Sequence, residues 1–316
     1  MKNSKFLYSW GVLLFWFVFM TWHGLWAYIA QHWPVSITMI FGSFVAGATT
    51  EGGGAVAFPV FTKLLHVPSN VARDFALAIQ SIGMTCGSLL IIRKGYKFLP
   101  EVFGWSFLGA SVSVIFCLEY IAPQIPSPYP KILFTLFTTC FGFFLLFLSS
   151  GNRTVHTEIP LNSWRRRLAF ITVGIVGGFI SALVGSGADV VLFVVLCLRY
   201  NLDEKIGTRT TVFLMGSVSM VAFLWKMITG TIAPEVLPMW LSAVPIVAFG
   251  APLGAIFCSW QKREHVVAFL LGLIFVELVT TIWLVPFDTQ ATLISLAFIT
   301  VSIGIMHLLQ KIRENE

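Results

Sequence analysis

The sequence predicts an all-α polytopic membrane protein, and its composition and its apolar pattern both support this fold class. Of the 316 residues, 57% are hydrophobic and only 11% are charged, whereas about 25% of the residues in a soluble domain are charged. Apolar segments of about 20 residues, the length that crosses a bilayer as a helix, recur along the whole chain. These observations exclude a soluble core with a single membrane-anchoring tail.

The apolar segments divide into two classes by length. The shorter ones span 8–30, 70–92, 101–122, 131–149, 206–228, 235–258, 265–285 and 289–309. The segments 36–66 and 168–199 are longer, and each has enough chain to enter the membrane, turn and leave by the same face, because a helix rises only about 1.5 Å per residue. We read the N-terminal apolar segment at 8–30 as a retained transmembrane helix, because it is too long and too rich in Trp for a signal peptide.

Both long segments are interrupted by glycines, and both carry an acid at the break. The first contains Glu51 followed by Gly52-Gly53-Gly54, and the second contains Gly185-Ser186-Gly187 followed by Asp189. Non-helical backbone at membrane depth is tolerated only where it is buried in protein or lines a wet cavity. A pair of such interruptions in two halves of a chain is typical of a transporter's binding site.

The distribution of Lys and Arg favours two re-entrant hairpins and eight full spans. With a cytoplasmic N-terminus, this topology places sixteen of the 20 Lys and Arg inside and leaves Lys63, Arg73, Lys131 and Lys226 towards the outside. If both long segments crossed fully, the best orientation would give twelve inside and eight outside. The positive-inside rule therefore favours the hairpins, with both termini in the cytoplasm of a cell whose inner membrane holds the chain.

The same topology makes the two halves an inverted repeat of a broken hairpin plus three transmembrane helices. A weak sequence similarity between the two halves supports the inverted repeat, because Phe44, Gly52 and Phe58 recur 135 residues later and Arg73 recurs as Arg209. The predicted organisation is an N-terminal transmembrane helix at 1–35, repeat 1 at 36–149, a cytoplasmic linker at 150–167, repeat 2 at 168–288, and a C-terminal transmembrane helix and tail at 289–316.

The first break resembles the glycine signature of the TauE/SafE family of sulfite and organosulfonate exporters. The family pattern G-x-x-G-x-G-G-G-x4-P is matched by Gly47, Gly52-Gly53-Gly54 and Pro59, with Thr50 in place of one glycine. The second break keeps Gly185 and Gly187, and Gly207-Thr208 match the "GT" start of the next helix. The resemblance covers about 40–305. It implies a secondary transporter that exports small sulfur-containing anions, sulfite or C2 organosulfonates.

Seven residues are expected to bind the substrate: Gly52, Gly53, Gly54, Ser186, Gly187, Arg73 and Arg209. Bare N–H groups at a helix N-terminus bind anions, although small residues also serve close helix packing in membranes. A guanidinium fork suits the oxygens of a sulfonate. The alternative for the two arginines is a gate, an orientation charge, or a pair with Asp74 or Glu204.

Three acids are candidates for proton coupling: Glu51, Asp189 and Glu277. An ionised carboxylate at the breaks would repel an anion, so these acids either carry a proton or pair with Arg or Lys. Glu277, in the middle of a helix, either carries a proton or pairs with Lys226.

The expected partners are a small anion, the lipid bilayer and, under coupling, protons. The scattered basic residues indicate no nucleic-acid partner. Neither a metal nor a cofactor is expected, because the five cysteines fall singly in apolar segments and no CxxC occurs. An anion channel or uniporter is the alternative transport mode. An intramembrane serine hydrolase using Ser186 would need a positioned base such as His307. The sequence leaves open the direction of transport, the coupling ion and the oligomeric state.

Overall fold

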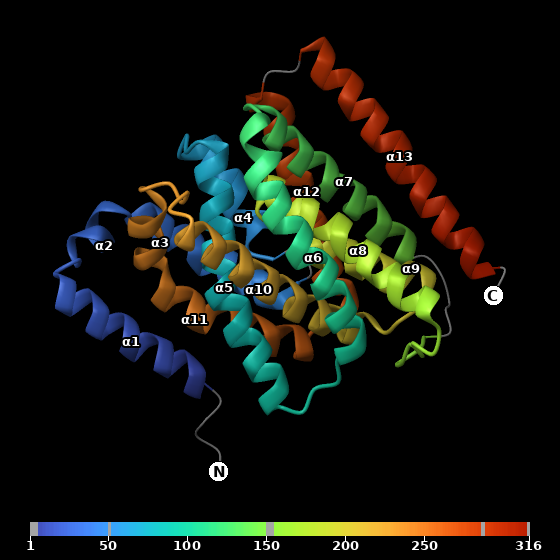
Figure 1. The fold of residues 1–316 in the computed structure, drawn as a ribbon, viewed down its shortest axis with the longest axis horizontal. Coiled ribbons are helices and arrows are strands. Elements are labelled where there is room, and N and C mark those ends of the chain that lie inside the picture. The colour runs from blue at the N-terminus through green and yellow to red at the C-terminus, as the bar shows by residue number, and fades with distance from the viewer. Residues whose placement is uncertain (1–5, 50–51, 150–154, 286–287, 315–316) are drawn as a thin grey trace.

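The computed structural model describes residues 6–49, 52–149, 155–285 and 288–314, and within these ranges the chain is helical with no β-strand (Figure 1). Eight helices are long and apolar enough to cross a membrane. They are α5 (Ser69–Arg93), α6 (Pro100–Tyr120), α7 (Tyr129–Ser149), α8 (Trp164–Val184), α10 (Glu204–Ile228), α11 (Val236–Trp260), α12 (Arg263–Leu284) and α13 (Thr289–Glu314). The predicted all-α polytopic membrane fold is confirmed.

The remaining elements are shorter. They are α1 (Leu7–His23), α2 (Ala27–Gln31), α3 (Trp33–Ala48), α4 (Gly54–Pro59), a π-helical turn (Val60–Leu64), a 3-10 turn (Ala122–Gln124) and α9 (Ala188–Arg199). Both long apolar segments break at the predicted glycines, since α3 stops before the triple glycine and α8 stops before Gly185. One difference from the expected spans is that α1 has only 17 residues, whereas α8 alone has 21.

The segment formed by α3 and α4 has both ends on one face of the molecule. Near its start, the Ser36 hydroxyl donates to the carbonyl of Ser242 in the first turns of α11. At its end, Lys63 contacts Glu277 and Thr281 in the last turns of α12. Because α11 and α12 follow one another through a tight turn, the start of α11 and the end of α12 share a face.

The segment formed by α8 and α9 also has both ends on one face. Trp164 at the start of α8 packs edge-on against Trp105 near the start of α6. Leu198 at the end of α9 packs with Leu145 in the last turns of α7. The start of α6 and the end of α7 share a face, because the two helices are consecutive and antiparallel.

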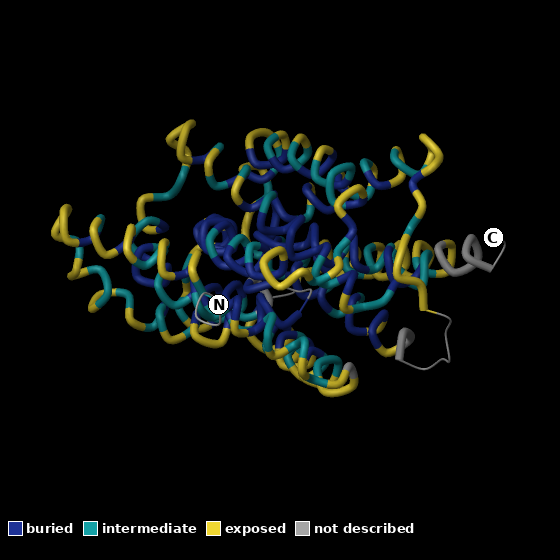
Figure 2. The backbone as a smooth tube through the Cα atoms, turned by 90° about the horizontal axis from the view of Figure 1, so that it is seen from below, coloured by how far each residue is buried: buried dark blue, intermediate teal, exposed yellow. Residues whose placement is uncertain are grey.

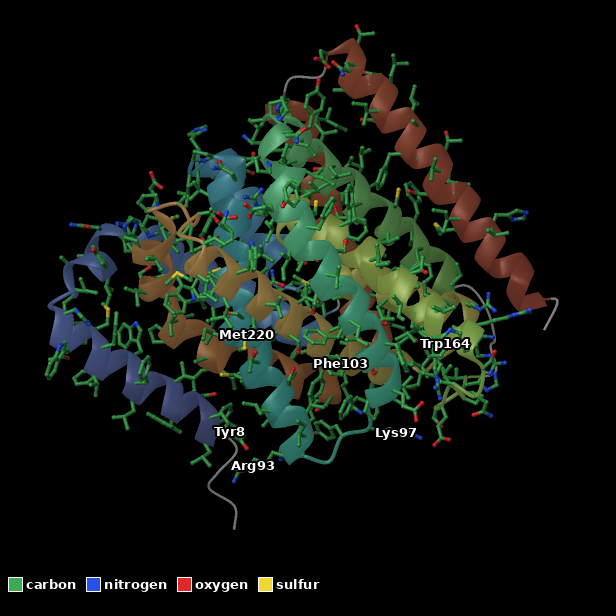
Figure 3. The ribbon with its side chains drawn as sticks, viewed as in Figure 1. Tyr8, Arg93, Lys97, Phe103, Trp164 and Met220 are labelled. Carbon is green, nitrogen blue, oxygen red and sulfur yellow. The ribbon has the colours of Figure 1, made fainter. Side chains whose placement is uncertain are left out.

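The two broken segments enter from opposite faces. At the centre, α5 and α10 are antiparallel, with Gly87 facing Val212 and Gly216 facing Met84. Since α6 follows α5 and α11 follows α10 through short connections, α6 and α11 also run in opposite directions. The segment that starts beside α6 therefore enters from the face opposite to the one that starts beside α11. We call the face that bears Arg93, Lys97 and Trp164 the basic face; Figure 3 labels these residues.

Glycines bring each broken segment into backbone contact with a full-length helix. A Cβ on Gly174 or Gly178 of α8 would collide with carbonyl oxygens of α6, and a Cβ on Gly47 of α3 would collide with the carbonyl of Ala251 in α11. The Ser113 hydroxyl of α6 also donates to the carbonyl of Ile175 at 2.7 Å. Small residues that let backbones touch are the usual means of helix association in membranes. They hold α3 parallel to α11 and α8 parallel to α6.

Burial is greatest at the centre and least in the terminal helices. Figure 2 shows buried backbone gathered in the middle of the molecule and exposed backbone around it. Helix α1 is attached to α11 through the Trp16 indole, which donates to the carbonyl of Leu241 at 2.7 Å. Helix α13 stands at the edge, beside α7 and α9 (Figure 1). The central position of α5 makes it the helix that both broken segments can reach.

The described part of the linker is fastened to the loops of the basic face. Lys97 and Glu158 form an exposed ion pair at 2.7 Å, and the hydrogen bond and charge of Lys97 lower the pKa of Glu158. The backbone N–H of His156 donates to the carbonyl of Asn201 at 2.9 Å. An exposed pair contributes little stability, so the backbone bond is the firmer attachment.

We expect Thr157 to face the cytoplasm and Thr231 to face the other side, because 157 lies on the basic face and 231 follows the far end of α10. The five native cysteines would be replaced by alanine, and Thr157→Cys and Thr231→Cys made separately. A membrane-impermeant thiol reagent should label only the cysteine at 231 in intact cells, and both after permeabilisation. Labelling of both positions, or of 157 alone, in intact cells would contradict this orientation.

Candidate functional site at the two helix breaks

The two breaks meet at one glutamine of α5. Gln80 donates from Nε2 to the carbonyl of Gly185 in the second break at 2.9 Å. On its other side, a Cβ built on Gly52 of the first break would lie 2.9 Å from Gln80 Oε1 and 3.1 Å from Asp189 Oδ2. Gln80 and Asp189 are 2% and 0% exposed. A single buried side chain therefore touches both broken segments.

Gly52 is the member of the triple glycine that the local backbone requires. Its φ is +67°, a region that strains residues with a Cβ. Gly53 has φ −68°, and the nearest atom to a Cβ there would be the carbonyl oxygen of Gly42 at 3.4 Å. In the second break, Gly185 and Gly187 have φ of +85° and +144°. Glu51 lies outside the described residues.

Asp189 uses one carboxylate oxygen to cap its own helix. Its Oδ1 accepts hydrogen bonds from the N–H groups of Gly187 at 3.2 Å and Val190 at 3.0 Å. The hydroxyl of Ser181 accepts from the N–H of Ala188 at 2.9 Å. These N–H groups at the start of α9 are the donors that we expected to bind an anion, and the protein itself occupies them.

Two buried oxygens beside Gly52 have no hydrogen-bond partner among the residues that the structure describes. They are Asp189 Oδ2 and Gln80 Oε1. The Ser186 hydroxyl is close enough to the carboxyl to interact with it, but no contact to Oδ2 has normal hydrogen-bond geometry. A buried acceptor without a donor is costly. The point where the breaks meet thus suits a proton or another positive species better than an anion.

A buried charge cluster lies beside the second break, towards the face opposite the basic face. Asp74 Oδ1 accepts from Arg73 Nε and Nη2 at 2.9 Å each, and Lys226 Nζ lies 2.6 Å from Asp74 Oδ2. All three residues are buried. Two cations against one carboxylate leave an excess of one positive charge. The backbone of Arg73 also packs against Gly185, so the cluster adjoins the second break.

Cationic residues also border the first break on the side of the basic face. The Arg209 guanidinium lies 4.5 Å from the centre of the Tyr96 ring. Two cavities of about 60 and 20 Å³ both have Lys205, Thr208 and Cys258 in their walls, and Arg209 lines the smaller one. The last residues of α3 complete these walls, so the cavities reach the start of the first break. Arg73 and Arg209 therefore lie on opposite sides of the breaks and not in one pocket.

Glu277 has a different partner from the one expected. Its Oε2 lies 2.6 Å from Lys63 Nζ, and its Oε1 accepts from the Thr135 hydroxyl at 2.7 Å. The expected pair with Lys226 is wrong, because α12 packs against α7 and α4 whereas α10 packs against α5. His307 lines an apolar groove of about 470 Å³ between α7, α12 and α13, and Ser186 is not part of that groove.

The pairing of Arg73 with Asp74 was one of the alternatives expected from the sequence. Sequence reasoning missed Gln80 and the contact of Asp74 with Lys226. A detectable signal exists for the first, because Gln80 is an uncharged polar residue inside the apolar stretch 75–84. Such residues form hydrogen bonds between membrane helices. The link between Asp74 and Lys226 depends on which helices are neighbours, and the sequence does not state that.

A comparison with protein families gives a match over most of the chain. The model described as "Sulfite exporter TauE/SafE" matches residues 35–281, which include both breaks, Gln80 and both arginines. A search of curated proteins and a search of solved structures each found no match. Since the family model covers well over half of the 316 residues, the chain belongs to the sulfite exporter TauE/SafE family of membrane transporters.

Proposed function

We propose that this protein is a secondary transporter that exports small sulfur-containing anions, sulfite or C2 organosulfonates, across the cell inner membrane. One observation carries the proposal: two broken helices enter from opposite faces and meet at Gln80. Transporters place their substrate and ion sites at such interrupted helices near the middle of the membrane. Family membership supports the class of substrate.

In this proposal the anion moves between two cationic stations. The first is formed by Lys205 and Arg209 at the cavities on the basic face, which we take to be the cytoplasmic side. The second is the Arg73–Asp74–Lys226 cluster with its excess positive charge. Each arginine has a planar guanidinium with donors that suit the oxygens of a sulfonate or sulfite. Gly52, Gly53, Gly54, Ser186 and Gly187 form the passage between the stations.

We infer further that 36–149 and 168–288 act as an inverted repeat. The contact of α3 with α11 corresponds to that of α8 with α6, and α5 and α10 correspond to each other at the centre. Movement of one half against the other would then expose the breaks to each face in turn. Both termini lie on the cytoplasmic side in this arrangement.

We expect Arg73→Lys and Arg209→Lys each to weaken substrate affinity about tenfold, because an ammonium cannot form the guanidinium fork. Purified protein in liposomes would be loaded with sulfite, isethionate, sulfoacetate or taurine, and the rate of release measured against concentration. The control is Arg165→Lys, an exposed arginine on the basic face. A parent protein that moves none of these anions would refute the proposed substrate class. Unchanged affinity in both variants would leave the arginines with a structural role.

Gly52→Ala should abolish release of the same anions, whereas Gly53→Ala should retain most of it. The first substitution adds a Cβ at positive φ, in contact with Gln80 and Asp189, while the second has space. Both proteins are first checked for insertion and monodispersity in detergent. Equal activity of the two well-folded variants would show that the contact at Gly52 is not needed for transport.

Asp189→Asn should make transport independent of pH while the anion still binds, because the amide keeps the shape of the side chain and cannot exchange a proton. The measurement is the initial rate of release across a series of pH values. Asp203→Asn is a suitable control, since Asp203 caps α10 at the basic face and Asn caps helices equally well. If the parent rate did not vary with pH, or if Asp189→Asn kept the parent profile, facilitated diffusion would be the better mechanism.

A further inference from the structure

We propose that Gln80 is the partner of the coupling proton: a proton on Asp189 Oδ2 is donated as a hydrogen bond to Gln80 Oε1, at the point where Gly52 of the first break passes. This inference rests on the proposed function, since it identifies how a proton would be held at the breaks. It adds a positioning residue on α5 that connects the titrating acid to both broken segments.

The geometry places two acceptors around one point. Gln80 Oε1 and Asp189 Oδ2 lie 2.9 and 3.1 Å from the position of a Gly52 Cβ, so they border the same point. The orientation of the Gln80 amide is fixed by its nitrogen, because Nε2 donates to the carbonyl of Gly185. Only Oε1 can then face the carboxyl. Both oxygens are buried and unpartnered.

One added proton would satisfy both oxygens. An ionised Asp189 leaves two acceptors facing each other without a donor, which is unfavourable in a buried site. A protonated Asp189 donates from Oδ2 to Oε1 and removes both unpaired groups at once. A hard metal cation such as Ca²⁺ or Mg²⁺ takes about six or more oxygens, and among the residues described here no cluster of three or more His, Cys, Asp or Glu side chains is suited to a metal.

The charged groups around Asp189 are engaged elsewhere. From α5 and α10 come Arg73, Asp74 and Lys226, which bind one another. From α7 comes Lys131, whose ammonium donates to the carbonyl of Thr62.

The other elements near Asp189 bring few charges. Arg209 of α10 stacks on Tyr96, and Lys63, after α4, binds Glu277. On α13, His307 lines the apolar groove, and the arginines of α8 lie at its far end. Glu51, beside Gly52 in the chain, is outside the described residues. Among the described residues, Gln80 is a polar side chain from another helix that borders the same point as Asp189 Oδ2.

The same contact would link the protonation of Asp189 to the positions of both broken segments. Gln80 Nε2 holds the second break through Gly185, while Oε1 faces Gly52 of the first. With Asp189 protonated, the amide is held at both ends and joins the two segments. With Asp189 ionised, repulsion between Oδ2 and Oε1 pushes the amide away and releases the junction. Proton binding is in this way linked to the movement of one half against the other.

Infrared spectroscopy tests this without knowledge of the substrate. The parent protein, Asp189→Asn, Gln80→Met and Ser186→Ala would be titrated with acid in lipid nanodiscs, while the carbonyl stretch of protonated carboxylic acids is recorded. Subtracting the Asp189→Asn spectra isolates the Asp189 band. Gln124→Met is the matched control, because Gln124 is exposed and far from the breaks in the 3-10 turn. Each titration is repeated with sodium replaced by choline.

We expect the parent protein to show an Asp189 band. Its pH midpoint should be lower by roughly one unit in Gln80→Met, because one pH unit corresponds to about the free energy of one hydrogen bond. The band should also move to higher wavenumber, since a free acid carbonyl vibrates faster than a hydrogen-bonded one. Gln124→Met should leave the midpoint in place, and Ser186→Ala should change it far less than Gln80→Met does. If Gln80→Met does not insert, Gln80→Glu replaces it, and two carboxyls sharing one proton should raise the midpoint instead.

Three results would overturn the inference. One is the absence of an Asp189 band at every pH at which the protein stays folded. Another is an unchanged band in Gln80→Met, or a band moved by Ser186→Ala instead. The third is a midpoint that depends on sodium, which would assign the two oxygens to a metal ion. None of these depends on the anion release assay, so failure of the proposed substrate class is recognised separately by that assay.

Discussion

The structure depends on one constraint: backbone that leaves a helix inside the membrane must find its hydrogen bonds within the protein. The second break meets it through the side chains of Asp189, Ser181 and Gln80, which together bind N–H or carbonyl groups from Gly185 to Val190. The Asp189 carboxylate is costly at membrane depth, but it therefore also has a structural role in this site. It is the cap that allows α9 to begin in the middle of the molecule, and only its second oxygen remains for another task.

A second requirement is that both broken segments be held firmly while their broken ends stay free to move. The glycines of α3, α8 and α11 provide the first part, because they bring backbones into direct contact over several turns. The glycines at the breaks do something different. Gly52, Gly185 and Gly187 have positive φ, so they are needed for the path of the chain and not for the proximity of helices. One residue type thus has two physical roles, and only the backbone angles separate them.

Sequence predicted the broken helices well and the contacts between helices poorly. The breaks, the boundaries of the apolar helices and the position of Asp189 at the second break all follow from local patterns of glycine, charge and hydropathy. The partner of Glu277 could not be found in this way, because basic residues occur in several segments of the chain and no local pattern states which segment is adjacent. Gln80 was missed for a related reason. An uncharged polar side chain in an apolar helix indicates a contact with another segment, but the sequence does not state which segments that contact joins.

The charges of the interior are distributed unevenly along the path through the breaks. Arg73 and Lys226 exceed the single carboxylate of Asp74 on one side of the breaks, and Lys205 and Arg209 line small cavities on the other. Between them, the polar atoms nearest to a Cβ on Gly52 are the oxygens Gln80 Oε1 and Asp189 Oδ2, beside the methyl group of Met84. Under the proposed function, an anion would be attracted to either side and repelled from the middle while Asp189 is ionised. Neutralising that one carboxylate removes the repulsion, so a proton and an anion would pass the centre together more readily than the anion alone.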